Sequence, residues 1–133
     1  MEFLKKIRPE WPLRLGLGLM YLYSGYDLFY HSSGWLWAVP SWFSQLIVPV
    51  ISVENYLRIQ GAGEFVMGLL FLAWFSGERG VRVAAVLASV EMAAILLFTG
   101  VDLVTFRDLG VLGAALALVI LVFREPNGTI SND

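Results

Sequence analysis

Several stretches of about 18 residues in this chain contain one charged side chain or none, which is near the length that a helix needs to cross a bilayer. Overall, 58% of the 133 residues are hydrophobic and 15% are charged, whereas about 25% of the residues of ordinary soluble domains are charged. A soluble domain of this size needs a more highly charged surface. We therefore expect an integral membrane protein that forms a single transmembrane domain over residues 1–133.

The apolar stretches predict an all-α fold, a membrane four-helix bundle. The predicted spans cover residues 12–30, 56–75, 83–99 and 107–123, followed by a polar tail over residues 124–133. A secretory signal peptide is the alternative for the first stretch, because basic residues precede it. However, the stretch is too long for a signal peptide and no small-residue cleavage pattern closes it.

A tryptophan-rich segment over residues 35–50 separates the first two spans. Tryptophan is enriched at membrane surfaces, where its ring is buried and its N–H reaches water or headgroups. We predict that this segment lies in the interface and contains a short helix over residues 41–48, with Ser41 as its N-cap. A fifth span is the alternative, but the stretch is short and contains a proline.

The positive charges predict the orientation. Seven basic residues fall on the side of the N-terminus: Lys5, Lys6, Arg8, Arg14, Arg79, Arg82 and Arg124. Only Arg58 and Arg107 fall on the opposite side. Cytoplasmic loops carry the excess of Lys and Arg, so both termini are expected in the cytoplasm.

Small and ionisable residues share a face in each predicted span. Membrane helices associate through small residues, because lipid is as apolar as leucine. The shared faces are Gly16, Met20, Tyr23 and Asp27; Gly61, Glu64 and Gly68; Ala84, Ala88 and Glu91; and Arg107, Gly110, Ala114 and Ala117. We expect these faces to point into the bundle.

The candidates for chemistry are the ionisable residues Asp27, Glu64, Glu91, Arg107 and Asp108. Such groups cost about 2.5–3.5 kcal/mol at membrane depth and usually face a partner or a wet cavity. We predict an outward-facing polar pocket in which Arg107 pairs with Glu64 or Asp27. The alternatives are an ion pair that only fixes helix register and, for Asp108, a first-turn acid favoured by the helix dipole. Arg14 is expected to extend to the cytoplasm.

Aromatic residues lie near the same pocket. The residues expected to line a quinone site are Tyr23, Tyr26, Trp35 and Trp37. A flat hydrophobic ligand fits an apolar cavity with a few polar groups, although an ordinary aromatic belt has the same composition. His31 is interpreted as a headgroup contact rather than a ligand.

The composition excludes several functions. With no cysteine, the chain has no thiolate metal site or c-type haem attachment. A single histidine excludes bis-histidine haem, and no Glu-x-x-His pair suggests a di-iron site. A net charge of −2 gives no basic surface for nucleic acid. Any redox centre must come from a partner protein.

Three motifs carry a resemblance to a known family. They are Arg14-Leu-Gly-Leu-Gly-Leu through Ser24-Gly25, Gly61-Ala-Gly-Glu64, and Phe106-Arg107-Asp108-Leu-Gly110-Val-Leu-Gly113-Ala-Ala. Over residues 12–123 the chain resembles the DoxX-like family of small four-helix bacterial and archaeal membrane proteins. This resemblance implies a multi-pass protein of the inner membrane of a prokaryotic cell. The resemblance implies a link to redox metabolism, since DoxD relatives are subunits of thiosulfate:quinone oxidoreductase. It marks Glu64, Arg107 and Asp108 as functional positions and brings no established catalytic mechanism.

Three functions are compatible with these residues. The first is a quinone-binding redox subunit that depends on a partner, with Asp27, Glu64 or Glu91 as proton acceptors and Arg107 polarising a quinone carbonyl. It would be at most one subunit of an oxidoreductase. The second is binding or transport of a small lipophilic or anionic ligand. The third is an assembly or anchoring subunit in which the charged cluster is purely structural. We expect the chain to have a protein partner or to form a homo-oligomer.

Overall fold

The computed structural model describes residues 8–73, 77–102 and 105–124, and every regular element in these ranges is a helix. The predicted basic start (residues 1–7) and the tail beyond Arg124 lie outside the described residues. In chain order the elements are α2 (Glu10–Tyr30), the 3₁₀ helix η1 (Ser32–Ala38), α3 (Ser41–Ile47), α4 (Val53–Leu72), α5 (Gly77–Thr99) and α6 (Phe106–Phe123). The all-α class is confirmed, and long helices lie at the four predicted places.

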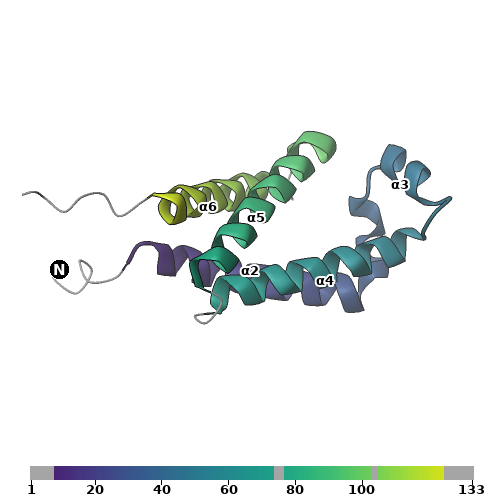
Figure 1. The fold of residues 1–133 in the computed structure, drawn as a ribbon. Coiled ribbons are helices and arrows are strands. Elements are labelled where there is room, and N and C mark those ends of the chain that lie inside the picture. The colour runs from purple at the N-terminus through teal and green to yellow at the C-terminus, as the bar shows by residue number, and fades with distance from the viewer. Residues whose placement is uncertain (1–7, 74–76, 103–104, 125–133) are drawn as a thin grey trace, which may run out of the picture.

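The four long helices form two antiparallel hairpins (Figure 1). Helix α2 packs most extensively on α4, and α5 packs on α6, while smaller contacts between α2 and α6 and between α4 and α5 join the hairpins. The start of α2 and the end of α6 lie at the same end of the molecule (Figure 1). The chain order is therefore up, down, up, down.

Glycines bring the backbones of α2 and α4 into direct contact. A Cβ atom built at Gly25 would lie 2.5 Å from the backbone N of Phe65, and one built at Gly61 would lie 2.8 Å from the carbonyl oxygen of Gly25. A Cβ at Gly68 would likewise lie 2.8 Å from the backbone N of Leu22. Backbone cannot move aside as a side chain can, so these positions accept only glycine at this helix separation.

The predicted inward faces are confirmed for two helices and wrong for the other two. The predicted small residues of α4 and α5 are buried, Gly61 and Gly68 among them. In α2, however, Gly16 is exposed, and the buried glycines are Gly18 and Gly25. The reason is that the face of α2 with Gly18 and Gly25 packs on α4, where glycines allow the two backbones to touch. In α6 the predicted residues Arg107 and Gly110 are exposed and Ala114 is only half-buried, whereas the fully buried residues are Ala115 and Leu118.

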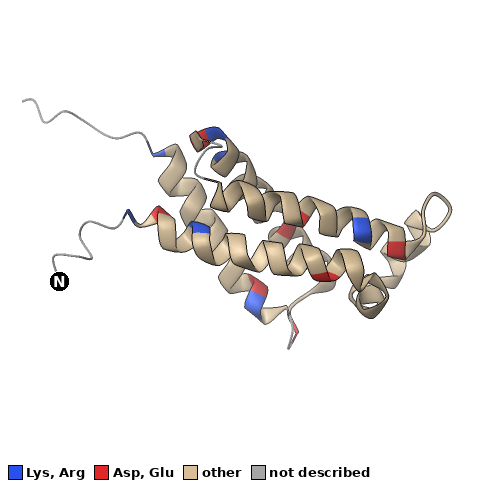
Figure 2. Ribbon diagram, turned by 90° about the horizontal axis from the view of Figure 1, so that it is seen from below, with Lys and Arg blue, Asp and Glu red and all other residues tan. Residues whose placement is uncertain are grey.

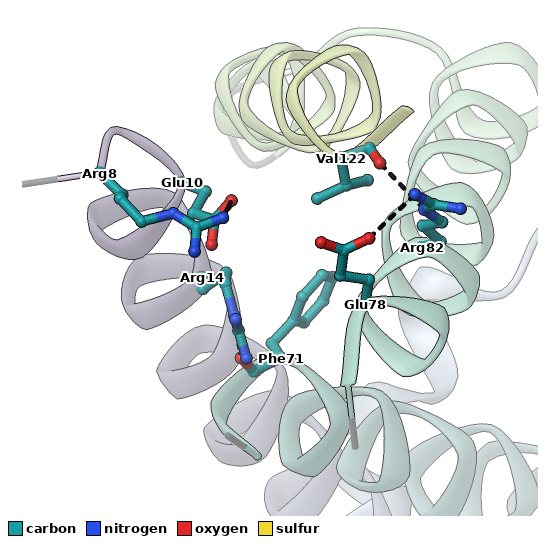
Figure 3. Close-up of polar contacts among 7 residues, drawn as sticks. All are labelled: Arg8, Glu10, Arg14, Phe71, Glu78, Arg82 and Val122. Carbon is teal, nitrogen blue, oxygen red and sulfur yellow. Dashed lines mark hydrogen bonds and ion pairs between the residues drawn. The ribbon is translucent and has the colours of Figure 1, made fainter. Parts of the chain in front are cut away.

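Two arginines each join the two helices of one hairpin, at the end of the molecule where α2 begins (Figure 3). Arg14 donates from Nε to the carbonyl oxygen of Phe71 at 2.8 Å and from Nη2 to that of Ala73 at 3.1 Å. Arg82 donates from Nε to the carbonyl oxygen of Val122 at 2.9 Å. These carbonyls lie at helix C-termini, where intrahelical donors run out and a cation is favoured. Arg14 is only 8% exposed, so the expectation that it extends to the cytoplasm is wrong.

The segment between α2 and α4 contains η1 and α3, two short helices in the region predicted to be interfacial. The short helix expected at residues 41–48 is present as α3, but Ser41 is its first residue and not its N-cap. The cap position belongs to Pro40, whose side chain makes no capping bond. By contrast, Ser52 caps α4, since its Oγ accepts a hydrogen bond from the backbone N of Asn55 at 3.3 Å.

Within the described residues, two helices are long and apolar enough to cross a membrane, α5 and α6. Helices α2 and α4 are of similar length but less apolar, because they carry polar and charged side chains such as Tyr23 and Asp27 in α2 and Glu54 and Arg58 in α4. Charged residues are nevertheless few along all four helices (Figure 2). Large apolar side chains are exposed on each of them, including Leu19, Ile59, Val90 and Ile120.

Candidate functional site

A polar cluster lies inside the bundle where α2, α4 and α5 meet. We call it the carboxyl cluster, and its members are Tyr21, Ser24, Gln60, Glu64 and Glu91. The amide Nε2 of Gln60 donates to Oε1 of Glu64 at 3.3 Å and to Oε1 of Glu91 at 3.4 Å. One donor atom therefore joins two carboxyl groups that come from different helices.

Both carboxyl groups are withdrawn from the surface. Glu64 is 4% exposed, and Ser24 of α2 lies next to it. The Oε2 atom of Glu91 is fully buried and has no hydrogen-bond partner among the residues described. A buried polar atom without a hydrogen-bond partner typically costs about 1–3 kcal/mol of stability.

Tyr21 forms the wall of the cluster toward α5. It is fully buried, its ring packs against Phe71 with centroids 5.9 Å apart, and its hydroxyl donates to the carbonyl oxygen of Ala88 at 3.5 Å. The hydroxyl also lies next to the Glu91 carboxyl. The cluster thus contains an amide, two hydroxyls and two carboxyls within the hydrophobic core.

Local helix geometry explains why these residues meet. Gln60 and Glu64 are four residues apart, so their side chains share one face of α4. Gly61 and Gly68 lie on that face and let α2 come close, which places Tyr21 and Ser24 above it. The alanines of α5, fully buried at Ala84 and Ala88, bring Glu91 against the same site.

Asp27 lies apart from this cluster, at the C-terminal end of α2. Its Oδ2 accepts a hydrogen bond from Nε1 of Trp35 at 2.7 Å, and its Oδ1 is 3.0 Å from Nδ1 of His31. Tyr26 lies beside this group, with its ring edge toward His31 at 6.3 Å between centroids. Sequence reasoning placed Asp27 in an inward pocket, whereas the structure joins it to the segment that follows α2.

Arg107 and Asp108 lie in the first turn of α6, and within the described residues Arg107 is not paired with its predicted partners Glu64 and Asp27. The ion pairs formed within the described part of the chain do not include one between Arg107 and Glu64 or between Arg107 and Asp27. Arg107 instead lines the rim of an open groove of about 340 Å³ between α2 and α6. The rest of its lining is Pro12, Leu13, Gly16, Leu17, Met20, Gly110, Val111 and Ala114.

The groups expected to share one polar pocket therefore lie in separate parts of the structure. Neither the groove at Arg107 nor a second one of about 250 Å³ at Trp37 and Trp42 is lined by Glu64 or Glu91. The two glutamates lie enclosed between helices instead. Among the described residues, the predicted pairing of Arg107 with Glu64 or Asp27 is not formed, and Arg107 lies instead at the groove between α2 and α6.

The predicted aromatic residues also lie in different surroundings. Tyr23 is 75% exposed on the outer face of α2. Trp35 and Trp37 stack on each other, with centroids 6.0 Å apart and ring planes inclined by 19°. Tyr26 packs on Tyr30 at 4.8 Å. These residues cover the end of α2 and do not line the carboxyl cluster.

Sequence reasoning missed Gln60, Ser24 and Tyr21 as members of a site. A signal for Gln60 was available, since a polar amide one turn before Glu64 on an otherwise apolar helix predicts a shared hydrogen bond. Tyr21 could be found only from the contact of α2 with α5, which a single sequence does not show.

Within the described ranges no group of three or more His, Cys, Asp or Glu side chains is placed to hold a metal ion. Compared with protein-family models, with curated proteins and with solved structures, the chain shows no match. The resemblance to the DoxX-like family therefore remains a prediction from the three sequence motifs.

Proposed function

We propose that the chain is an integral membrane subunit of quinone-linked redox metabolism, and that its carboxyl cluster exchanges protons for a partner protein. The observation that carries this proposal is the shared bond of Gln60 to Glu64 and Glu91 inside an apolar core. Ionisable groups at membrane depth typically belong to proton relays or ligand pathways. Quinone reduction needs two protons for two electrons, which two adjacent carboxyl groups are suited to supply.

The proposed arrangement is a four-helix membrane bundle with both termini in the cytoplasm. It is supported by the antiparallel order of the helices (Figure 1) and by the apolar side chains exposed on all four. Arg14 is buried at the predicted cytoplasmic end, whereas Arg82 stays partly exposed there. The electrons must come from a partner, since the chain has no cysteine and one histidine.

An anchoring or assembly subunit is the second candidate. It is favoured by the hydrogen bonds that the acidic groups make inside the chain, because Glu64 has Gln60 and Asp27 has Trp35. In that case the cluster would only specify how the helices pack. The two candidates differ in what happens when a carboxyl is replaced by its isosteric amide.

The test is purification in a mild detergent, followed by identification of co-purifying protein and by organic extraction for quinone. We expect a redox partner and a bound quinone with the unmodified chain. Glu64→Gln and Glu91→Gln should keep the partner but lower its quinone-dependent activity, whereas the exposed control Glu54→Gln should not. A partner whose activity is unchanged in both amide variants would favour the anchoring role.

A further inference from the structure

The groove between α2 and α6 is apolar for most of its length. Its lining extends from Pro12 to Met20 on α2 and from Arg107 to Ala114 on α6. Because an α-helix rises about 1.5 Å per residue, the groove follows the two helices for roughly 10–12 Å. Its volume of about 340 Å³ lies at the lower end of the range for ligand pockets, which enclose about 300–1,000 Å³. The groove therefore has room for one slender ligand.

Two glycines leave this space open. Gly16 of α2 and Gly110 of α6 both line the groove, and a Cβ atom built at either one would meet nothing within 4 Å. At Gly25 and Gly61, by contrast, a Cβ atom would meet the backbone of the neighbouring helix. Gly16 and Gly110 therefore do not serve the contact between helices of this chain. They let an outside molecule lie directly against the backbones of α2 and α6.

A single charge lies at one end of the groove. Among the described residues that line it, Arg107 alone is charged. Arg107 lies close enough to Asp108 to act on its charge, but Asp108 does not line the groove. A guanidinium has five N–H donors, so a neighbouring carboxylate leaves others for a ligand. Arginine binds a carboxylate through two parallel hydrogen bonds. The groove thus combines an anion-binding group at one end with an apolar remainder.

The groove lies well below the end of α2. Its last residue on that helix is Met20, ten residues before Tyr30, so about 15 Å of α2 extends beyond it. In the proposed membrane arrangement a ligand therefore reaches the groove from the lipid and not from water. A soluble anion is disfavoured at this depth, whereas an anion attached to an apolar chain can enter.

We propose that this groove binds a long-chain fatty acid, with its carboxylate on Arg107 and its chain along Gly110 and Gly16. A fatty acid presents one chain and one anionic group, which match one apolar groove and one guanidinium. A glycerophospholipid has a second chain and a larger headgroup, which a single groove does not match. The proposal goes beyond the redox role and rests only on the membrane arrangement, because neither Glu64 nor Glu91 lines the groove.

The experiment is photoaffinity labelling of the full chain in phosphatidylcholine nanodiscs. The probes are a fatty acid with a diazirine on its chain and the fatty alcohol of the same length, in a mildly alkaline buffer that keeps the acid ionised. Labelled peptides are identified by mass spectrometry. We expect the acid to label residues 12–20 and 107–114 about fivefold more than the alcohol does, which is the effect of one partly exposed ion pair. Both probes should label the exposed face of α5 equally, which shows that the chain is in the bilayer.

Variants separate the chain of the ligand from its carboxylate. Gly110→Leu fills the groove and should abolish labelling of its peptides by both probes, and Gly16→Leu, which fills it from α2, should have the same effect. Gly113→Leu is the matched control, because a Cβ atom at Gly113 also meets nothing within 4 Å and this residue does not line the groove. Arg107→Gln should reduce labelling by the acid to the level of the alcohol. Arg79→Gln removes an exposed cation outside the groove and should keep the preference.

Equal labelling of the groove by acid and alcohol would overturn the proposal, as would a preference that survives Arg107→Gln or a loss in Gly113→Leu as large as in Gly110→Leu. Groove peptides that neither probe labels, while α5 is labelled, would show that another molecule such as a second copy of the chain covers them. Displacement of the acid by an equal amount of phosphatidylglycerol would assign the groove to a phospholipid. Either of these two results would also overturn the proposal. The variants of the carboxyl cluster test the redox role separately.

Discussion

Glu64 and Glu91 share a single donor, the Nε2 atom of Gln60, which lies 3.3 Å from one carboxyl and 3.4 Å from the other. Gln60→Met keeps the length of the side chain but leaves both acceptors without this donor. We expect the free energy of unfolding in detergent to fall by about 1–2 kcal/mol. Gln45→Met, at an exposed position of α3, is the control and should change it by less than about 0.5 kcal/mol. Equal effects of the two substitutions would show that the shared bond does not stabilise the fold.

The contact between Gly25 and Gly61 predicts a steric effect. In Gly61→Ala the new Cβ would lie 2.8 Å from the carbonyl oxygen of Gly25 and from the backbone N of Phe29. The two helices must then separate, at a cost of about 1–3 kcal/mol. Gly63→Ala meets nothing within 4 Å and should be neutral or stabilising by up to about 1 kcal/mol. Thermal unfolding of both variants in the same detergent distinguishes them, and a Gly61→Ala protein as stable as the control would contradict the backbone contact.

Because the guanidinium of Arg14 is buried and bonded to two carbonyl oxygens, we predict that these hydrogen bonds stabilise the fold more than its charge does. Arg14→Met leaves the carbonyl oxygens of Phe71 and Ala73 without their donor, and should cost about 2–3 kcal/mol of unfolding free energy. Arg14→Lys should recover only part of this, because an ammonium lacks the planar fork that reaches two carbonyls. Arg79→Met removes an exposed cation near the same end and should cost less than about 0.5 kcal/mol. A loss of equal size for Arg14→Met and Arg79→Met would argue against the capping role.

The proposed topology makes a prediction for α4, which is less apolar than α5 and α6. Because the chain has no cysteine, single cysteines can be placed without background labelling. Ser41→Cys precedes α4 and should react with an impermeant maleimide added outside intact cells. Glu78→Cys follows α4 and should react only after the membrane is permeabilised. Labelling of both from the same side would show that α4 does not cross the bilayer.

Much of the fold could be predicted from the sequence because apolar periodicity reports helices directly. The structure has helices at the predicted places, although α5 begins at Gly77 and not near residue 83. Residues 77–82 include Glu78, Arg79 and Arg82 and two glycines, so hydropathy alone could not assign them to the helix. Gly100, with a φ of +81°, ends α5 where the apolar stretch ends.

Which face of each helix is buried was predicted less well from the sequence. In α2 both Gly16 and Gly18 are small, and only contact with α4 selects Gly18 and Gly25 as the packed pair. In α6 the pattern of small residues predicted that Arg107 points inward, whereas Leu118 and Ala115 do. When a helix is apolar on every side, its sequence pattern does not specify its rotation. Glu64 and Glu91 were nevertheless both predicted on inward faces, because small residues mark those faces in α4 and α5.

The most direct test of the proposed function is the rate of quinone reduction by the co-purified preparation with Glu64→Gln and Glu91→Gln, compared with Glu54→Gln. A positioned acid or base typically contributes about 10²–10⁴-fold to a rate. We therefore predict a loss of about 100-fold or more for each cluster variant, at unchanged partner recovery, and no loss for Glu54→Gln. Cluster variants that retain the full rate with the partner bound would contradict proton exchange by the carboxyl cluster.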